Sequence, residues 1–454
     1  MFKRFMVSAK KSEKKGFARP ELLLPAGNLE KLKIGLQYGG DAFFMGFSPF
    51  SLRAKEGGFD KDSFIEGVSL IRGAGKTFYM TINAYLRGGK FDIFKDHIDF
   101  VRKELMPDAI IVADPGVFQM LREYYPEAVL HMSVQTNITN YMAVDFWKKQ
   151  GASRIILPRE LTLDEISRIH ENVPDIELEV FVHGAICMAY SGRCLLSNWM
   201  TERDSNQGSC SHSCRWKYKV YDETSMEKRK KELSGGQVGN GHKDLGDGQI
   251  YLEEEKRPGQ FMPVDEDENG TYIMNSKDNC CLPYLKELAE AGVCSFKVEG
   301  RNKTEYYLAT VAKAYRRAID DLMAGKKFDK SLIDEINKTA NRGFIPGYLF
   351  GFPSDVPDVH YASNAPMQTH KFIGMVTGER EKADLYNVSV RNRLNKGEIV
   401  EVMTPDEQFE VKVDEMFDVE GRELDAIHGG AGERILALRK GLPVGAMLRV
   451  KCAA

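Results

Sequence analysis

Four cysteines stand close together near the middle of this chain, and they are the strongest chemical signal in the sequence. Cys187, Cys194, Cys210 and Cys214 fall within twenty-eight of the 454 residues, and the whole chain has eight cysteines. In a reducing compartment, clustered thiols are more often metal ligands or catalysts than structural disulfides. The cluster therefore predicts a metal or cofactor site held by these four residues.

The spacing of the cysteines favours one kind of metal site over another. The first pair has the pattern C-x6-C and the second has C-x3-C, whereas zinc ligands usually come in pairs separated by two to four residues. Wider, unequal spacing suits an iron–sulfur cluster, whose corners point in different directions. A cluster is favoured over zinc, and unrelated buried cysteines are the third alternative. The spacing assigns no role to Cys280, Cys281, Cys294 and Cys452.

A second set of candidates consists of polar side chains at or near the ends of short apolar runs. If these runs are the parallel strands of a barrel, their carboxyl ends meet at one mouth, where barrel enzymes carry their sites. Arginine forks suit carboxylate or phosphate ligands, and salt bridges within the set are the alternative. The candidate catalytic residues are His183, Glu179, Arg159, Glu160, Lys297, Glu299 and Arg301, and the same ring includes Asn83, Asp114, Gln135 and Asn137.

The segments that must position these residues alternate between apolar, β-branched runs and stretches with helical period. Eight such units predict an α/β fold, a (β/α)8 TIM-like barrel. A doubly wound open sheet is the alternative, but no G-x-G-x-x-G follows the first run. The predicted strands are 21–27, 41–46, 76–83, 107–114, 128–135, 153–160, 177–184 and 293–300.

Composition shifts divide the chain further. A cysteine-rich insertion, residues 185–270, interrupts the barrel (20–351) before its last strand, and its polar, glycine-rich part after residue 225 reads as a flexible surface loop. Residues 1–19 read as a basic disordered tail and the proline-rich residues 352–368 as a linker. In 369–454, six alternating runs predict a small C-terminal all-β barrel domain.

Charge and hydropathy exclude some classes of protein. The formal net charge of −3 does not indicate a general nucleic-acid binder. No run of about 18 apolar residues could span a bilayer, and the N-terminus lacks the features of a secretory signal. A cytoplasmic location is therefore expected. The zincin, serine hydrolase and P-loop motifs are all missing from the sequence.

Several segments together resemble the collagenase-like peptidase family, and most of all its branch of prephenate-dependent tRNA uridine hydroxylases. They include "ELLLPAGNLEKLKIGLQYGGDAFFMG", "EVFVHGAICMAYSGRCLLS", "NQGSCSHSCRW" and "SFKVEGRNKTEYY". The family signature Glu, Phe, His, Gly, Cys falls on Glu179, Phe181, His183, Gly184 and Cys187. The resemblance runs from about residue 20 into the C-terminal domain.

This resemblance implies a cofactor, a co-substrate and a partner. It implies a [4Fe–4S] cluster on Cys187, Cys194, Cys210 and Cys214. The chain departs from the family pattern at Cys280, which is an alternative candidate for one of the ligands. The resemblance also implies that prephenate supplies the hydroxyl group and that the tRNA anticodon loop presents the wobble uridine, which becomes 5-hydroxyuridine. A collagenase-like peptidase and an rRNA cytidine hydroxylase of the same family are the competing functions.

Overall fold

The computed structural model describes most of the chain. The described residues are 17–46, 50–51, 58–86, 88–186, 189–203, 210–216, 218–221, 223–233, 250–254, 258–259, 261–264, 266–267, 270–271, 277–351, 367–381 and 384–452. Most of the expected basic tail, most of the expected linker and the cluster candidate Cys187 lie outside these residues.

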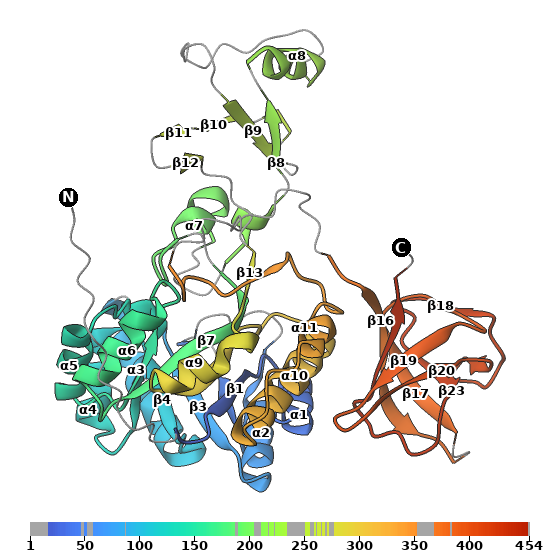
Figure 1. The fold of residues 1–454 in the computed structure, drawn as a ribbon, viewed down its shortest axis with the longest axis horizontal. Coiled ribbons are helices and arrows are strands. Elements are labelled where there is room, and N and C mark those ends of the chain that lie inside the picture. The colour runs from blue at the N-terminus through green and yellow to red at the C-terminus, as the bar shows by residue number, and fades with distance from the viewer. Residues whose placement is uncertain are drawn as a thin grey trace.

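Eight parallel strands form a closed barrel, as the alternating pattern predicts. The last of them pairs with the first on one side and with the seventh on the other, so the sheet closes on itself (Figure 1). In sheet order the strands are β14 (Val293–Val298), β1 (Glu21–Pro25), β2 (Ala42–Met45), β3 (Thr77–Ile82), β4 (Ala109–Val112), β5 (Leu130–Met132), β6 (Arg154–Leu157) and β7 (Glu177–Ala185).

Helices follow the strands and cover the outside of the barrel. Several begin at a polar side chain that accepts a backbone N–H of the first turn: Asn28, Asp60, Thr162 and Thr304 each do so. These caps fix where the chain turns back along the barrel. The helices are α1 (Leu29–Gln37), α2 (Lys61–Gly73), α3 (Phe91–Phe100) with the π-helical turn Val101–Leu105, α4 (Pro115–Tyr124), α5 (Tyr141–Lys149), α6 (Leu163–Asn172), α9 (Leu285–Glu290), α10 (Glu305–Met323) and α11 (Ser331–Ile336).

Alternation along the strands separates two cores. Residues such as Leu22 and Phe43 face the helices and join the large outer core. Their neighbours face the barrel axis, where Leu23, Phe44 and Phe181 belong to a smaller inner cluster. The inner cluster fills the barrel, so a ligand has access only at its ends.

The insertion begins where β7 ends and stands beyond the carboxyl ends of the strands (Figure 1). Its described elements are α7 (Leu196–Thr201), the short 3-10 helix Ser213–Arg215, β8 (Tyr218–Tyr221), α8 (Glu223–Leu233), β9 (Ile250–Glu254), β10 (Phe261–Val264), β11 (Glu266–Asp267) and β12 (Gly270–Thr271). The chain then returns to the barrel, where β13 (Asp278–Cys280) pairs with β7 and with β15 (Phe344–Ile345).

The expected flexible loop after residue 225 is partly ordered, which corrects that prediction. β8, β9 and β10 form an antiparallel sheet, and α8 precedes β9. A few anchors hold the unit together despite its polar composition. Met226 and Leu252 are buried, and Glu253 accepts a hydrogen bond from the hydroxyl of Tyr221 and faces Arg229.

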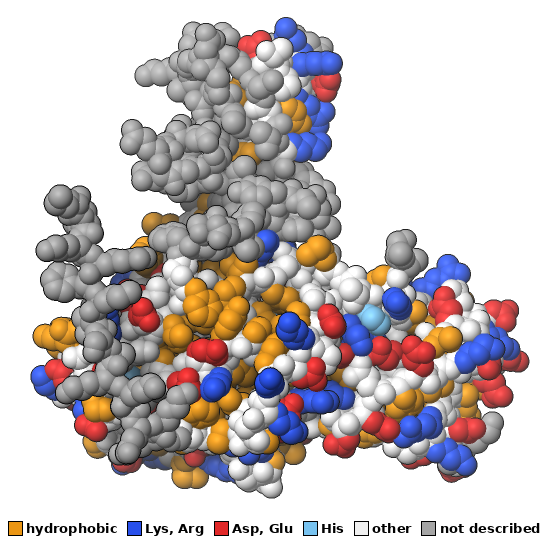
Figure 2. All heavy atoms as spheres, viewed as in Figure 1, with side chains coloured by type: hydrophobic (Ala, Val, Ile, Leu, Met, Phe, Trp, Pro, Cys, Tyr) orange, Lys and Arg blue, Asp and Glu red, His pale blue; other side chains and the backbone are white. Residues whose placement is uncertain are grey.

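The C-terminal region is an antiparallel half-barrel sheet with its own hydrophobic core. Its order is β20, β19, β24, β16, β17, β23, β21, and β18 pairs with β22 beside it. Figure 2 shows charges of both signs mixed over this region, whereas hydrophobic side chains gather on the barrel near α9. The strands are β16 (His370–Glu379), β17 (Leu385–Val390), β18 (Leu394–Asn395), β19 (Ile399–Met403), β20 (Gln408–Lys412), β21 (Met416–Phe417), β22 (Ala426–Ile427), β23 (Glu433–Ala437) and β24 (Met447–Lys451).

An ion cluster joins the sheet to the barrel helices. The side chain of Arg449 is fully buried and contacts the carboxylates of Glu335 in α11 and Glu401 in β19. Burial opposes the ionisation of Glu401, but Arg449 and Lys338 outweigh it and lower its pKa to about 2. Tyr38, directly after α1, also has its hydroxyl 3.0 Å from the backbone carbonyls of Met403 and Gly445 in the C-terminal region. The two regions therefore meet through a fixed, buried contact.

Within the described residues, no helix is both long enough and apolar enough to cross a membrane.

Candidate functional site

The carboxyl ends of the barrel strands carry a group of polar side chains that we call the mouth. Asn83 follows β3 and Gln135 follows β5. Arg159 follows β6, while Glu299 and Arg301 follow β14. Because all these strands are parallel, their ends meet on one face, which is the face below the insertion (Figure 1).

Arg159 is an arginine with an 11% exposed side chain and incomplete pairing. Its guanidinium carbon lies 4.0 Å from the ring centroid of Phe181. Its nearest carboxylate oxygen, on Glu299, is 3.9 Å away. Its Nε is buried and has no hydrogen-bond partner in the described part of the chain. A buried donor without a partner costs free energy, so this guanidinium is suited to receive an anionic ligand.

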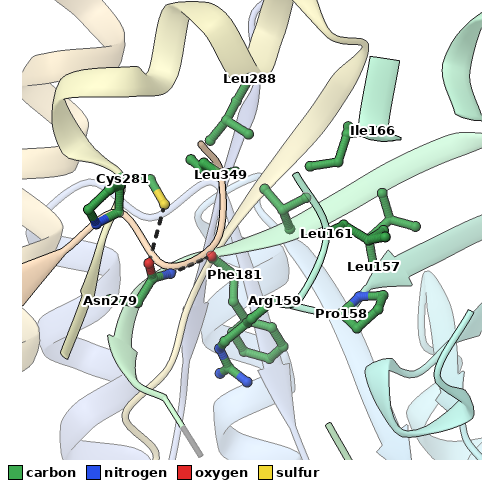
Figure 3. A pocket seen from close by; sticks show the side chains of 12 residues that line it. Leu157, Pro158, Arg159, Leu161, Ile166, Phe181, Asn279, Cys281, Leu288 and Leu349 are labelled. Carbon is green, nitrogen blue, oxygen red and sulfur yellow. Dashed lines mark hydrogen bonds between the residues drawn. The ribbon is translucent and has the colours of Figure 1, made fainter. Parts of the chain in front are cut away.

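A small cavity lies next to Arg159, between β6, β7 and the segment before α9 (Figure 3). Its volume is about 20 Å³, which is room for little more than one water molecule. Asn279 donates to the carbonyl of Phe181 and accepts from the thiol of Cys281 across this cavity. The hydrogen bonds of Asn279 therefore fix the strand ends around the cavity, and the cavity itself is too small to hold a substrate.

Gln135 carries a second unpartnered donor at the mouth. Its Oε1 accepts from Asn83 Nδ2 at 2.9 Å and from Ser133 Oγ at 3.2 Å. These two bonds fix the amide, which is 5% exposed, and leave Nε2 without a partner in the described residues. Asn137 Oδ1 is a buried acceptor that also has no hydrogen-bond partner in the described residues. The mouth thus offers both a donor and an acceptor in fixed positions.

The loop that bears Cys194 lies against Gln135. A Cβ on Gly192 would come within 2.6 Å of the Gln135 Cα, and Gly192 has a positive φ of 72°. Only glycine allows so close an approach in that conformation. The backbone N–H of Ser191 also donates to Glu160 at 2.8 Å. Glu160 therefore holds this loop over the mouth.

The other described cysteines lie on a segment tied to the same loop. The N–H of Ser211 donates to Ser197 Oγ at 2.8 Å, which joins the start of α7 to the segment between Cys210 and Cys214. Cys210 Sγ accepts the N–H of His212 at 3.4 Å. His212 in turn lies 3.0 Å from the amide of Asn302 at the mouth.

The thiols of this segment are the ligand type that iron–sulfur clusters use. Cys194, Cys210 and Cys214 take part in no disulfide. Cys187 is outside the described residues, and no three metal-binding side chains within the described ranges lie close enough together to hold a metal. Cys280 is buried at β13 with its thiol 3.8 Å from the hydroxyl of Tyr315.

Glu179 and Lys297 lie below the mouth, which for Lys297 differs from its expected position in the ring. Lys297 Nζ is 2.7 Å from Glu179 Oε1, and Arg154 approaches the other oxygen at 3.1 Å. Arg154 also reaches Glu21 at 2.8 Å, and Ser295 donates to both carboxylates. We call these five residues the inner ion network. Glu179 and Lys297 point toward the barrel axis because they occupy inward strand positions.

Two aromatic rings separate this network from the mouth. Lys297 Nζ lies 4.4 Å from the Phe44 ring and 5.3 Å from the Phe181 ring. Arg301 and Arg159 contact the same two rings from the mouth. Burial lowers the pKa of Lys297, and Glu179 opposes that shift. The sequence indicates Phe181 only as part of the family signature, and it does not single out Phe44, for which an inward strand position was the available signal.

His183 also differs from its expected position, because it faces the helices. Phe181 pairs with Lys297, but His183 pairs with the next residue, Val298, so β7 has one extra residue and the alternation changes side. The His183 ring packs among Tyr307, Tyr315 and Phe344. Burial lowers its pKa to about 4.

Arg301 is a candidate that does reach the mouth. Its NH1 lies 3.3 Å from Ser51 Oγ and 3.5 Å from Thr81 Oγ1. The two hydroxyls hydrogen-bond to each other at 2.5 Å. Ser51 and Thr81 were not predicted from the sequence, because single hydroxyl residues give no pattern. Of the candidate catalytic residues, the structure brings Arg159, Glu299 and Arg301 to the mouth, with Glu160 holding the loop above it.

Comparisons with family models and with known proteins agree on one family. The model of peptidase family U32 matches residues 27–356, and the model of that family's C-terminal domain matches residues 368–449. The chain is 40% identical over 418 residues to tRNA hydroxylation protein P of Escherichia coli K12, covering 90% of this chain and 92% of that protein. It is 35% identical over 416 residues to tRNA hydroxylation protein P1 of Bacillus subtilis 168, covering 90% and 89%.

Among solved structures, the U32 peptidase Mk0906 is similar over 64% of this chain and 97% of its own, at 14% identity and a TM-score of 0.38.

Proposed function

The chain belongs to peptidase family U32, as its motifs indicated, and we propose that it is a cytoplasmic enzyme that hydroxylates tRNA. The observation that carries the proposal is its similarity, over nine-tenths of both chains, to tRNA hydroxylation protein P. The specific reaction that we propose converts the wobble uridine of the anticodon loop to 5-hydroxyuridine, with prephenate as the hydroxyl donor.

The mouth supplies groups that suit both substrates. Prephenate is a dicarboxylate, and the guanidinium groups of Arg159 and Arg301 suit carboxylates because they offer paired donors. Uracil presents carbonyl oxygens and an N–H on one edge, which are complementary to the unpartnered Gln135 Nε2 and Asn137 Oδ1. Unpaired loop bases are the parts of RNA that proteins read most readily.

The cysteines extend the proposal to a cofactor. We propose that Cys187, Cys194, Cys210 and Cys214 hold a [4Fe–4S] cluster above the mouth. Such a cluster would supply one-electron redox chemistry at that point. Gly192 and Glu160 keep the loop with Cys194 against Gln135, so these residues set the distance between the cysteines and the bound base.

The peptidase name of the family is the competing proposal. At the mouth, the described hydroxyl in contact with a carboxylate is that of Ser191, which donates to Glu160 at 3.1 Å. Glu160 also accepts the backbone N–H of Ser191, so this contact holds the loop in place, and no described histidine orients the pair as amide hydrolysis by a serine would need. We therefore rank hydrolysis second.

The test is an assay of the full-length protein purified without oxygen. Unmodified tRNA is incubated with and without prephenate, and its nucleosides are analysed by mass spectrometry. Appearance of 5-hydroxyuridine only with prephenate would support the proposal. Cleavage of casein or denatured collagen without any change in tRNA would favour the peptidase, and a modified cytidine in rRNA would favour the rRNA hydroxylase.

A further inference from the structure

A groove of about 660 Å³ opens where the mouth side of the barrel meets the C-terminal sheet. One wall consists of the loop after β14, the first turn of α10 and Lys31 of α1. The other wall is formed by residues 371 and 372 of β16 and by residues 391 and 392 after β17. Figure 1 shows α10 and α11 beside β16 at this junction. No part of the proposed reaction uses the groove.

Positive charge dominates the lining of the groove. Lys31, Lys303, Lys371 and Arg391 line it, against one lining carboxylate, that of Glu305. Neither Lys371 nor Arg391 forms an ion pair within the described ranges; the carboxylate of Glu30 interacts with Arg391 only at longer range. Within the described ranges, Lys371 and Arg391 are therefore not neutralised by a close carboxylate, and these two cations can take up an anion at little cost.

The groove is already formed before any ligand binds. On its floor, the rings of Tyr306 and Phe372 are stacked with centroids 4.8 Å apart and planes within 3°. The guanidinium of Arg449 lies beside Tyr306 and ties the same two regions together through Glu335 and Glu401. Because the two aromatic rings stack on each other, they fix the shape of the groove floor. The charged side chains that line the groove would supply the attraction for a ligand.

The groove is continuous with the mouth and with the cysteine segment. Lys31 Nζ donates to the backbone carbonyl of Arg301 at 3.3 Å, and the side chain of Arg301 enters the mouth. Asn302, which lines the groove, contacts His212 between Cys210 and Cys214. The groove lining therefore adjoins the mouth, within reach of a polymer that places one of its units there.

We propose that this groove binds the sugar–phosphate backbone of the RNA next to the nucleotide that enters the mouth. Lysine and arginine contact phosphates without reading sequence, and the amides of Asn302, Asn392 and Gln368 on the groove lining suit phosphate oxygens and 2′-hydroxyls. A peptide is a poorer fit because the aromatic floor offers no open apolar pocket. The inference rests on the proposed function, since it takes the polymer to be tRNA.

The test measures binding of unmodified tRNA by the full-length protein purified without oxygen, at several salt concentrations. We expect Lys371→Glu and Arg391→Glu each to weaken binding by about tenfold and to lower the salt dependence by about 0.7 to 0.9 per lost phosphate contact. The matched control is Lys440→Glu, an exposed residue of the same domain that does not line the groove, which should change affinity less than about twofold.

Turnover separates this inference from the proposed function. In the groove variants, the loss should appear mainly in the tRNA concentration for half-maximal hydroxylation. If Lys371→Glu does not fold, the neutral substitutions Lys371→Gln and Arg391→Gln are used in place of the two substitutions by glutamate. Hydroxylation with unchanged affinity in the groove variants would overturn the inference and leave the function standing. A wild-type protein that neither binds nor modifies tRNA would overturn the proposed function itself. Polyglutamate serves as an acidic peptide probe in the same binding assay. If the groove variants lose binding of polyglutamate but keep binding of tRNA, the choice of RNA as the ligand of the groove is wrong.

Discussion

The inner ion network and the mouth share two strands, since Lys297 stands two residues before Glu299 at the end of β14 and Arg154 stands five residues before Arg159 at the end of β6. The charged side chains of the two regions are nevertheless paired to very different extents. In the network, Glu179 is 0% exposed and both of its oxygens are taken by Lys297, Arg154 and Ser295. At the mouth, Arg159 and Gln135 keep buried donors without partners. The comparison indicates that complete pairing marks charges that hold the barrel, and incomplete pairing marks positions prepared for a ligand.

The strongest way to break this comparison is to remove one member of the network. We expect Lys297→Met to lower the free energy of unfolding by about 3 to 5 kcal/mol, because Glu179 would remain buried with a missing partner. Unfolding in urea followed by circular dichroism measures the change. Glu179→Gln combined with Lys297→Met should recover part of the loss. Wild-type stability of Lys297→Met would mean that the network does not hold the barrel.

The same substitution at the mouth should have the opposite outcome. Arg159→Met removes a buried donor that lacks a partner, so stability should change by less than about 1 kcal/mol or increase. Under the proposed function, hydroxylation should fall by about 100-fold, which corresponds to about 2.7 kcal/mol. Unfolding and nucleoside analysis of one protein preparation measure both quantities. A destabilised Arg159→Met with full activity would reverse the roles of the two regions.

The sequence predicted the scaffold better than it predicted this division of charges. Each barrel strand could be found because it is a short apolar run between turn residues and helical segments. The depth of Glu179 and Lys297 could not be found, because alternation gives the face of a residue and not its height in the barrel. The side on which His183 lies depends on one extra residue in β7, and a bulge of this kind has no sequence signature there.

A glycine at the edge of the mouth sharpens the comparison further. Gly192→Ala should cost about 2 kcal/mol, since it combines a positive φ with a clash against Gln135. Gly325→Ala is the matched control, because its φ is +70° and nothing lies within 4 Å of the added Cβ, so it should cost about 1 kcal/mol. Unfolding in urea measures both values. Iron content, if the cluster is present, should fall only in the first variant, and equal behaviour of the two would mean that the loop does not rest on Gln135.

The smallest expected effect is the contribution of His183 to the pH dependence of the free energy of unfolding. Burial lowers its pKa to about 4 in the folded protein, with Asp278 opposing and Lys303 adding to the shift, while the unfolded chain has the ordinary value near 6.5. Between these values the unfolded chain binds more protons, so stability falls as pH decreases. From pH 7 to pH 5.5 the wild type should lose about 1 kcal/mol more than His183→Phe.

Urea unfolding at the two pH values measures this difference for His183. The ring of phenylalanine can occupy the same space among Tyr307, Tyr315 and Phe344, so packing is preserved and only the titration is removed. His97→Phe should give a difference of similar size, because burial also lowers the pKa of His97 to about 4. If His183→Phe and the wild type lose equal stability, His183 is charged or exposed in solution. In that case it would belong with the mouth, as the sequence had predicted, and not with the fully paired interior.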